Sequence, residues 1–115
     1  MTTSKASERA SLLQGTLDLL VLRTLLFGPM HGHGIAKAIQ KNSEDLLLVD
    51  HGSLYPALHR LEVKKWLSAE WQASETGREA RVYSLTKVGK KQLALEKESW
   101  DRLNAAVKLI FAGNE

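Results

Sequence analysis

Apolar residues follow one another almost without interruption from Leu12 to Phe27. The run is too short to cross the roughly 30 Å of a bilayer, and charged residues such as Asp18 interrupt it, so it predicts a core helix. Thr16 is the expected N-cap, and Gly28 with Pro29 is expected to end the helix. Because apolar side chains surround most of this helix, we expect a second subunit to share their burial.

A shorter helix is predicted from about His31 to Lys41, where Ile35, Ala36 and Ile39 fall at helical spacing. The apolar run Leu46–Val49 that follows is too short for a helix. It predicts a brief strand or an extended segment.

The stretch Gly-Ser-Leu-Tyr-Pro-Ala-Leu-His-Arg-Leu-Glu at 52–62 predicts a helix that ends near Lys65. Ser53 is the expected cap, and Pro56 is expected in the first turn, where its missing N–H costs nothing. One face collects the apolar residues Leu54, Ala57, Leu58 and Leu61, and the opposite face carries Tyr55, Pro56, His59, Arg60 and Val63. That mixture suits phosphates and base edges, which predicts a DNA-recognition helix; on this segment alone, an ordinary surface helix is the alternative.

The period of the pattern changes after this helix. Apolar and polar residues alternate over 67–72 and again over Arg81–Thr86, with turn formers between them at Ser74–Glu79. This arrangement predicts an antiparallel hairpin, and a hairpin after a recognition helix is a wing. Arg78 at its tip and Arg81 on its second strand are candidate phosphate contacts, and ordinary solubilising charges are the alternative.

A last helix is predicted from a cap at Thr86 to about Phe111, roughly 37 Å long. Its apolar stripe, at steps of three, four and seven, is Leu93, Trp100, Leu103, Val107 and Ile110. Such a stripe would be a liability in a monomer, so we predict that it forms a dimer interface together with Leu17. A helix that folds back as a lid over its own domain is the alternative.

Composition narrows the function classes. A chain of 115 residues predicts one domain with little room for an enclosed catalytic pocket. The net charge of +3, from 16 basic and 13 acidic residues, permits a nucleic-acid partner without demanding one. The absence of cysteine excludes disulfides and thiolate chemistry, and the polar N-terminus shows no secretion signal. We therefore expect a cytoplasmic protein with no membrane partner.

Histidines are the remaining candidates for metal or catalytic chemistry. His31 and His33 are close in sequence but are expected to diverge, and no His-Glu-x-x-His motif is present. A nucleophile elbow for a Ser/His/Asp triad is also missing. We expect no catalytic residues, no metal and no cofactor, and hence no enzyme.

Several motifs resemble the PadR-like transcriptional regulators. They are Thr16–Leu20 with Arg23–Leu25, Gly28–Gly32, Gly52–Glu62 and Tyr83–Gly89, and the resemblance covers about residues 12 to 111. Gly-Ser-Leu-Tyr-Pro-Ala-Leu is the most specific of them. The resemblance implies a homodimeric winged helix-turn-helix protein, usually a repressor of nearby genes. It also implies an inverted-repeat operator and often release by a small aromatic or amphipathic effector.

Site residues are carried over by position. The resemblance implies DNA contacts from Lys37, Ser53, Tyr55, Pro56, His59, Arg60, Arg78 and Arg81. It implies an effector site between the terminal and first helices, formed by Leu12, Leu13, Trp100 and Leu103, with plain interface packing as the alternative for Trp100. The chain departs from many relatives at His33, where they have tyrosine, and at Val82, where they have an aromatic residue.

Together these observations predict a mainly α fold with a small β-hairpin. Residues 1–10 are expected to be a disordered arm, 11–86 a winged helix-turn-helix domain and 87–115 a dimerisation helix. The predicted function is sequence-specific transcriptional regulation. We expect a homodimeric repressor that binds an operator in double-stranded DNA and is released by a small-molecule effector. A winged helix that binds only proteins is the alternative.

Overall fold

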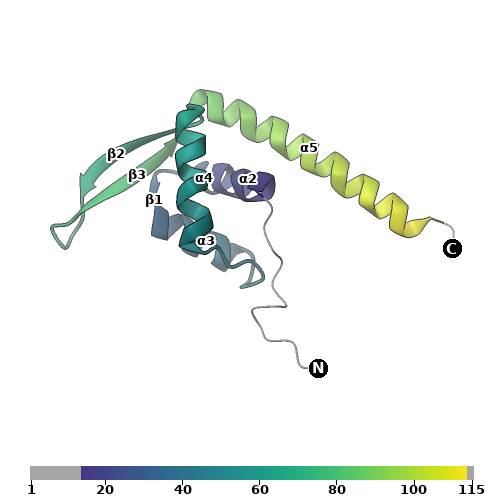
Figure 1. Cartoon of the computed structure of the whole chain (residues 1–115), viewed down its shortest axis with the longest axis horizontal. Coiled ribbons are helices and arrows are strands. Elements are labelled where there is room, and N and C mark those ends of the chain that lie inside the picture. The colour runs from purple at the N-terminus through teal and green to yellow at the C-terminus, as the bar shows by residue number, and fades with distance from the viewer. Residues whose placement is uncertain (1–13, 114–115) are drawn as a thin grey trace, which may run out of the picture.

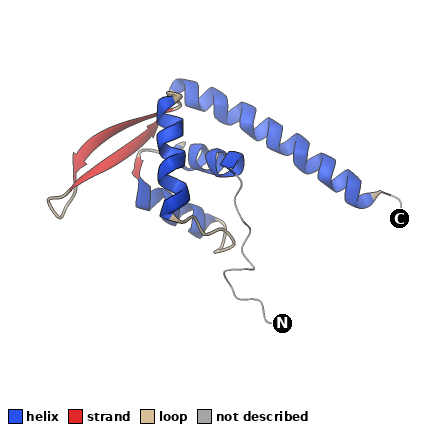
Figure 2. Cartoon of the chain, viewed as in Figure 1, coloured by secondary structure: helices blue, strands red, loops and turns tan. Residues whose placement is uncertain are grey.

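The computed structural model describes residues 14–113, so the predicted arm at 1–10 lies outside the described residues. The elements are α2 (Gln14–Leu25), β1 (Met30–His31), α3 (Gly32–Asn42), α4 (His51–Val63), β2 (Leu67–Ala73), β3 (Glu79–Leu85) and α5 (Lys87–Ala112). The hairpin β2–β3 extends from one side of α2, α3 and α4, and α5 extends from the other (Figure 1). Figure 2 shows a mainly helical chain with one small sheet, which confirms the predicted fold class.

Helix α2 lies at the centre and contacts α3, α4, α5 and β3. The core that surrounds it consists of Leu17, Val21, Leu22, Leu25, Ile35, Ala36, Ile39, Val49, Leu54, Ala57, Leu58, Leu61, Leu67 and Tyr83. One chain therefore covers most of α2, so the apolar surface of this helix does not by itself require a partner. Leu17, predicted in the dimer interface, is only 3% exposed and belongs to this core.

The ends of α2 differ from the prediction. Thr16 lies inside the helix, so it is not the N-cap. The helix ends at Leu25, and Gly28 adopts φ 138°, a conformation that only glycine reaches without strain. The predicted stop at Gly28 and Pro29 is therefore correct to within three residues.

The sheet has three strands in the order β1-β3-β2, because Met30 and His31 pair with Tyr83 and Val82. Strand β1 was not predicted, because two residues carry no alternation. His31 also caps α3, with its Nδ1 accepting the N–H of Gly34 at 3.0 Å. The predicted second helix is confirmed to within one residue at each end.

The connector between α3 and α4 forms no strand at 46–49, so the strand predicted there as one of two options is wrong. The buried side chain of Val49 anchors this connector in the core. Asp50 then caps α4, because its carboxylate accepts the N–H of Ser53 at 2.8 Å. Ser53 is thus not the cap. Pro56 lies in the second turn, where its missing N–H leaves the Gly52 carbonyl without the usual helical donor.

The wing and α5 meet at a tight junction. Strands β2 and β3 pair from Leu67↔Leu85 to Ala73↔Glu79, as the hairpin prediction requires. Thr86 caps α5 by accepting the N–H of Gly89 at 3.0 Å, which confirms the predicted cap. A Cβ at Gly89 would lie 2.1 Å from the carbonyl oxygen of Trp66, so only glycine lets α5 leave the sheet at this point.

Candidate nucleic-acid interface

The outward face of α4 carries an exposed ridge. Four α4 residues are completely buried against the core, namely Leu54, Ala57, Leu58 and Leu61. Because a helix turns by 100° per residue, Tyr55, Pro56, His59 and Val63 lie on the other side, and all four are exposed. The α4 ridge, as we call these four residues, presents a phenol, a pyrrolidine ring, an imidazole and an isopropyl group. Such a surface offers both polar and methyl contacts to the edges of bases.

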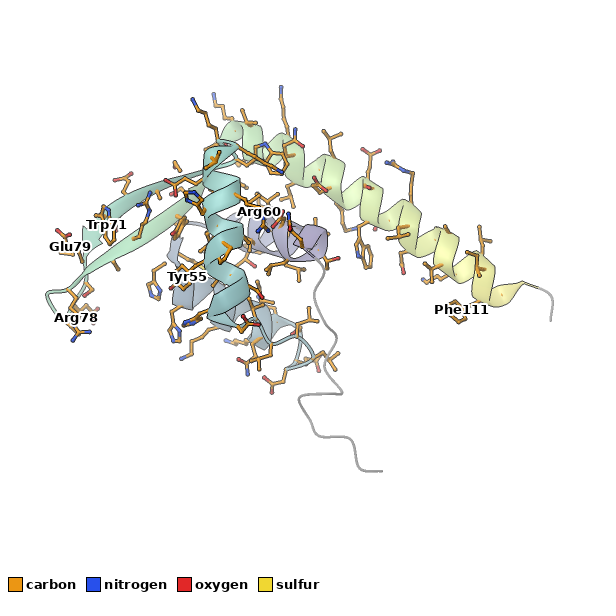
Figure 3. The ribbon with its side chains drawn as sticks, viewed as in Figure 1. Tyr55, Arg60, Trp71, Arg78, Glu79 and Phe111 are labelled. Atoms are coloured by element: carbon orange, nitrogen blue, oxygen red, sulfur yellow. The ribbon has the colours of Figure 1, made fainter. Side chains whose placement is uncertain are left out.

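Tyr55 is oriented by close packing on the start of α3. A Cβ at Gly32 would lie 2.8 Å from the Tyr55 ring and hydroxyl oxygen, so the ring packs directly on the backbone there and a larger residue would displace it. The ring also meets that of His51 edge-on at a centroid distance of 5.5 Å. The phenol is thus held in place while 43% of the residue stays exposed (Figure 3).

Arg60 points towards α2 and not outward as predicted. Its guanidinium lies 3.0 Å from the carboxylate of Asp18, which is only 7% exposed. Burial raises the pKa of the Asp18 carboxyl, although the charge and hydrogen bond of Arg60 act in the opposite direction. The prediction that Arg60 lies on the exposed face is therefore wrong, because its side chain joins α4 to α2.

Arg81 is also held within the chain. It forms an ion pair with Glu62 near the end of α4, and its guanidinium lies 5.6 Å from the centroid of the Trp71 ring. Between α4 and the wing is a hollow of about 340 Å³ lined by His59, Glu62, Val63, Arg81 and Tyr83. Arg78 and Glu79 lie beyond it, near the far end of the wing, where both are exposed (Figure 3).

The two other predicted DNA contacts lie on either side of the α3–α4 connector. Lys37 is exposed on α3 and lines a shallow hollow with Glu44 and Asp45, whose carboxylates give that surface mixed charge. Ser53 is exposed, with its hydroxyl 3.4 Å from a carboxylate oxygen of Asp50. The structure therefore brings Ser53, but not Lys37, into the same helix as the ridge.

The imidazoles of His31, His33 and His51 are neighbours, which corrects the expectation that the first two diverge. The rings of His31 and His33 are nearly parallel with centroids 6.3 Å apart. The ring of His51 meets that of His33 edge-on at 5.8 Å. Within residues 14–113, however, no group of three His, Cys, Asp or Glu side chains could hold a metal ion.

Two predicted effector residues, Trp100 and Leu103, line a cavity of about 250 Å³ between α2 and α5. Its other walls are Gly15, Thr16, Leu19, Glu96 and Ser99. Leu12 and Leu13 lie outside the described residues. A larger cavity of about 410 Å³, not predicted, is lined by Leu20, Arg23, Thr24, Phe27, Ile39, Asn42, Ser43 and Leu47.

Helix α5 leaves the body with its apolar side chains uncovered in the single chain. Exposed fractions are 39% for Trp100, 62% for Leu103, 41% for Val107, 77% for Ile110 and 84% for Phe111. Of the predicted stripe, only Leu93 packs partly against the core. The stripe predicted from the sequence is therefore a real surface feature of this helix.

The three helices α2, α3 and α4 with the small sheet form a winged-helix fold. A sequence model of the transcriptional regulator PadR-like family matches residues 21–95. The chain belongs to that family, so the resemblance seen in the sequence is confirmed. No helix in the described part of the chain is long and apolar enough to span a membrane.

Solved structures support the same assignment. A PadR family transcription regulator from Clostridium difficile R20291 is 30% identical, with a TM-score of 0.68, and the match covers 84% of this chain and 98% of that one. A transcriptional regulator from Clostridium thermocellum is 25% identical with a TM-score of 0.77, covering 83% and 92%. Among curated proteins, an uncharacterised protein of Lysinibacillus sphaericus is 25% identical over 93% of this chain and 98% of its own length.

Proposed function

We propose that this regulator acts as a homodimeric repressor that binds an inverted-repeat operator through α4 and the wing. The observation that carries the proposal is the α4 ridge of Tyr55, Pro56, His59 and Val63, beside a wing with Arg78 near its tip. In this arrangement the ridge enters the major groove, and the phosphate strand passes over the hollow between α4 and β3.

In this proposal the wing and the ridge make different kinds of contact with DNA. Arg78 supplies a phosphate contact, whereas Tyr55 and His59 supply contacts to base edges or thymine methyl groups. Arg81 reaches phosphate only if it leaves Glu62, so it contributes less than a free arginine. Arg60 contributes by fixing α4 on α2, because its guanidinium is engaged by Asp18.

The proposed dimer is formed by α5. The exposed stripe from Trp100 to Phe111 is unfavourable in water, and a second copy of the same stripe can cover it around a twofold axis. Two recognition helices would then face successive major grooves about 34 Å apart.

An effector site is proposed at the cavity between α2 and α5, where Trp100 offers a flat stacking surface. A ligand that prefers one angle between α5 and the body would change the separation of the two recognition helices. Isothermal calorimetry with planar aromatic compounds tests this site, and Trp100→Leu should remove binding without unfolding the protein. Unchanged binding in Trp100→Leu would place the ligand elsewhere.

Selection from a random pool of duplexes tests the DNA-binding proposal. We expect the recovered duplexes to share an inverted repeat, and Tyr55→Phe or His59→Gln to lower affinity for it more than for unrelated DNA. Lys41→Gln, on the exposed end of α3, is the control and should leave the preference intact. Recovery of no shared sequence would instead favour the protein-binding alternative, for which the exposed Val63 and Trp71 offer apolar contacts on α4 and the wing.

A further inference from the structure

Three exposed histidines gather where α3 and α4 both begin, next to the α4 ridge. His31 precedes α3, His33 lies in its first turn, and His51 is the first residue of α4. The rings follow one another from His31 to His33 to His51 and then to Tyr55, each pair with centroids between 5.5 and 6.3 Å apart. The cluster thus continues the proposed DNA surface beyond Tyr55.

His31 differs from the other two in its hydrogen bonding. Its Nδ1 accepts the N–H of Gly34 at 3.0 Å, and a nitrogen that accepts carries no proton. His31 is therefore held as the tautomer with its proton on Nε2, a neutral donor. A second proton on this ring would break the cap of α3.

His33 and His51 have no such constraint. Neither ring caps a helix within residues 14–113, because His31 is the cap of α3 and Asp50 is the cap of α4. The ring of His51 lies edge-on between those of His33 and Tyr55. Imidazole is the side chain whose protonation most readily adds positive charge in the physiological pH range. Protonation of these two rings therefore adds positive charge beside Tyr55 without breaking a helix cap.

We propose that His33 and His51 are two further DNA-contacting residues, which bind backbone phosphate in their protonated form. They make affinity for DNA rise as the pH falls. The inference rests on the proposed DNA-binding function. It assigns a role to residues that neither the α4 ridge nor the wing includes.

Other charged groups near the cluster do not produce the same effect. They are the Asp50 carboxylate, the Tyr55 hydroxyl, the Lys37 ammonium one helical turn after His33, and Arg81 on the strand that pairs with β1. Asp50 accepts the N–H of Ser53, and Arg81 pairs with Glu62. Imidazole is the only side-chain type among them and the cluster whose ordinary ionisation falls between pH 6 and 8, so a change in DNA affinity over that interval reports on histidine.

The test measures binding of the full chain to a fluorescent duplex of arbitrary sequence, at constant ionic strength, between pH about 8 and pH about 6. An arbitrary duplex is the right probe because phosphate contacts do not depend on sequence. We expect the Kd to fall by about fivefold or more over this interval. The slope of log Kd against log salt should also steepen by about one to two units, one for each phosphate that a protonated imidazole neutralises.

Two variants locate the effect. His33→Tyr combined with His51→Asn should bind with the same Kd at both pH values, whereas Lys41→Gln, an exposed change on α3 outside both the cluster and the ridge, should keep the whole change. His59→Gln removes the histidine of the ridge and shows whether the change comes from there instead. The single variants His33→Tyr and His51→Asn should each remove about half of it, and they serve if the double variant does not fold. Circular dichroism at both pH values checks folding.

Each outcome has a distinct meaning. Binding that is independent of pH in the wild type, or that keeps its pH dependence in the double variant, overturns the role of the cluster but leaves DNA binding in place. Loss of the pH dependence in His59→Gln assigns the effect to the ridge and also overturns the inference. Absence of DNA binding at both pH values overturns the proposed function and the inference together.

Discussion

The guanidinium of Arg60 lies 3.0 Å from the carboxylate of Asp18, and this pair joins the proposed recognition helix to the helix at the centre of the core. Asp18 is almost fully buried, while about a third of the Arg60 side chain is exposed. A buried carboxylate without its partner is costly, so the pair fixes where α4 lies on α2. Helix α2 also lines the cavity beside Trp100, so the ion pair and the cavity share one helix.

Replacement of Arg60 should therefore affect folding before it affects DNA. We expect Arg60→Ala to lower the free energy of unfolding by about 2 kcal/mol, because the Asp18 carboxylate loses its only ion-pair partner within residues 14–113. Urea unfolding measures this, and Asp18→Asn with Arg60→Ala should cost less than the sum of the two single changes. Normal stability with loss of DNA binding would show that Arg60 leaves Asp18 for DNA.

The titration of Asp18 gives a pH prediction of definite sign. Burial raises its carboxyl pKa above the ordinary value of 3.8, so between 3.8 and the raised pKa the folded chain binds more protons than the unfolded one. The contribution of Asp18 to stability therefore increases as the pH falls through that window. Asp18→Asn cannot titrate there. Acidification should therefore make the wild type more stable relative to Asp18→Asn, as the two unfolding free energies measure. If acidification instead made the wild type less stable relative to Asp18→Asn, the attraction of Arg60 would outweigh the effect of burial on the Asp18 pKa.

The sequence predicted most of the fold because its main elements are long and periodic. The α4 faces, the hairpin and the cap of α5 at Thr86 all follow from local spacing. Strand β1 could not be predicted because it has two residues and forms only through its pairing with β3. The cap of α4 was misplaced because Ser53 and Asp50 are both good caps, and the backbone turn at Asp50 decides between them.

The candidate site was predictable only where helix geometry alone decides exposure. Tyr55, His59 and Val63 point outward because the apolar residues between them point inward. Arg60 was misplaced because its partner Asp18 is 42 residues away in the chain. The histidine cluster was missed for the same reason, since His33 and His51 come together only when α3 packs against α4.

Gly89 gives a test of the junction between the wing and α5. Gly89→Ala should destabilise the protein by about 1–3 kcal/mol, because its Cβ would overlap the carbonyl oxygen of Trp66. Gly15→Ala is the matched control, since a Cβ there meets nothing within 4 Å and alanine favours the helix. Thermal unfolding should thus move in opposite directions for the two variants. Equal effects would show that α5 can leave the sheet along another path.

The stripe on α5 gives a test of assembly. Ile110→Gln with Phe111→Gln should shift the protein from dimer to monomer, because these are the two most exposed apolar side chains on the helix. Arg102→Gln, with a side chain 72% exposed on the same helix, is the control and should leave the dimer intact. Analytical ultracentrifugation across a dilution series separates the two. A wild-type chain that sediments as a monomer throughout would contradict the dimer.

Arg78 and Glu79 are adjacent on the wing and should have opposite effects on DNA affinity. Arg78→Gln removes a cation near the tip, so DNA binding should weaken on every sequence, and the slope of log Kd against log salt should fall by about one. Glu79→Gln removes a negative charge that repels the same phosphates, so binding should tighten. Both side chains are exposed, so neither change should alter the unfolding temperature. If both variants bound DNA as the wild type does, the wing would lie away from the duplex, and only α4 would remain as the contact surface.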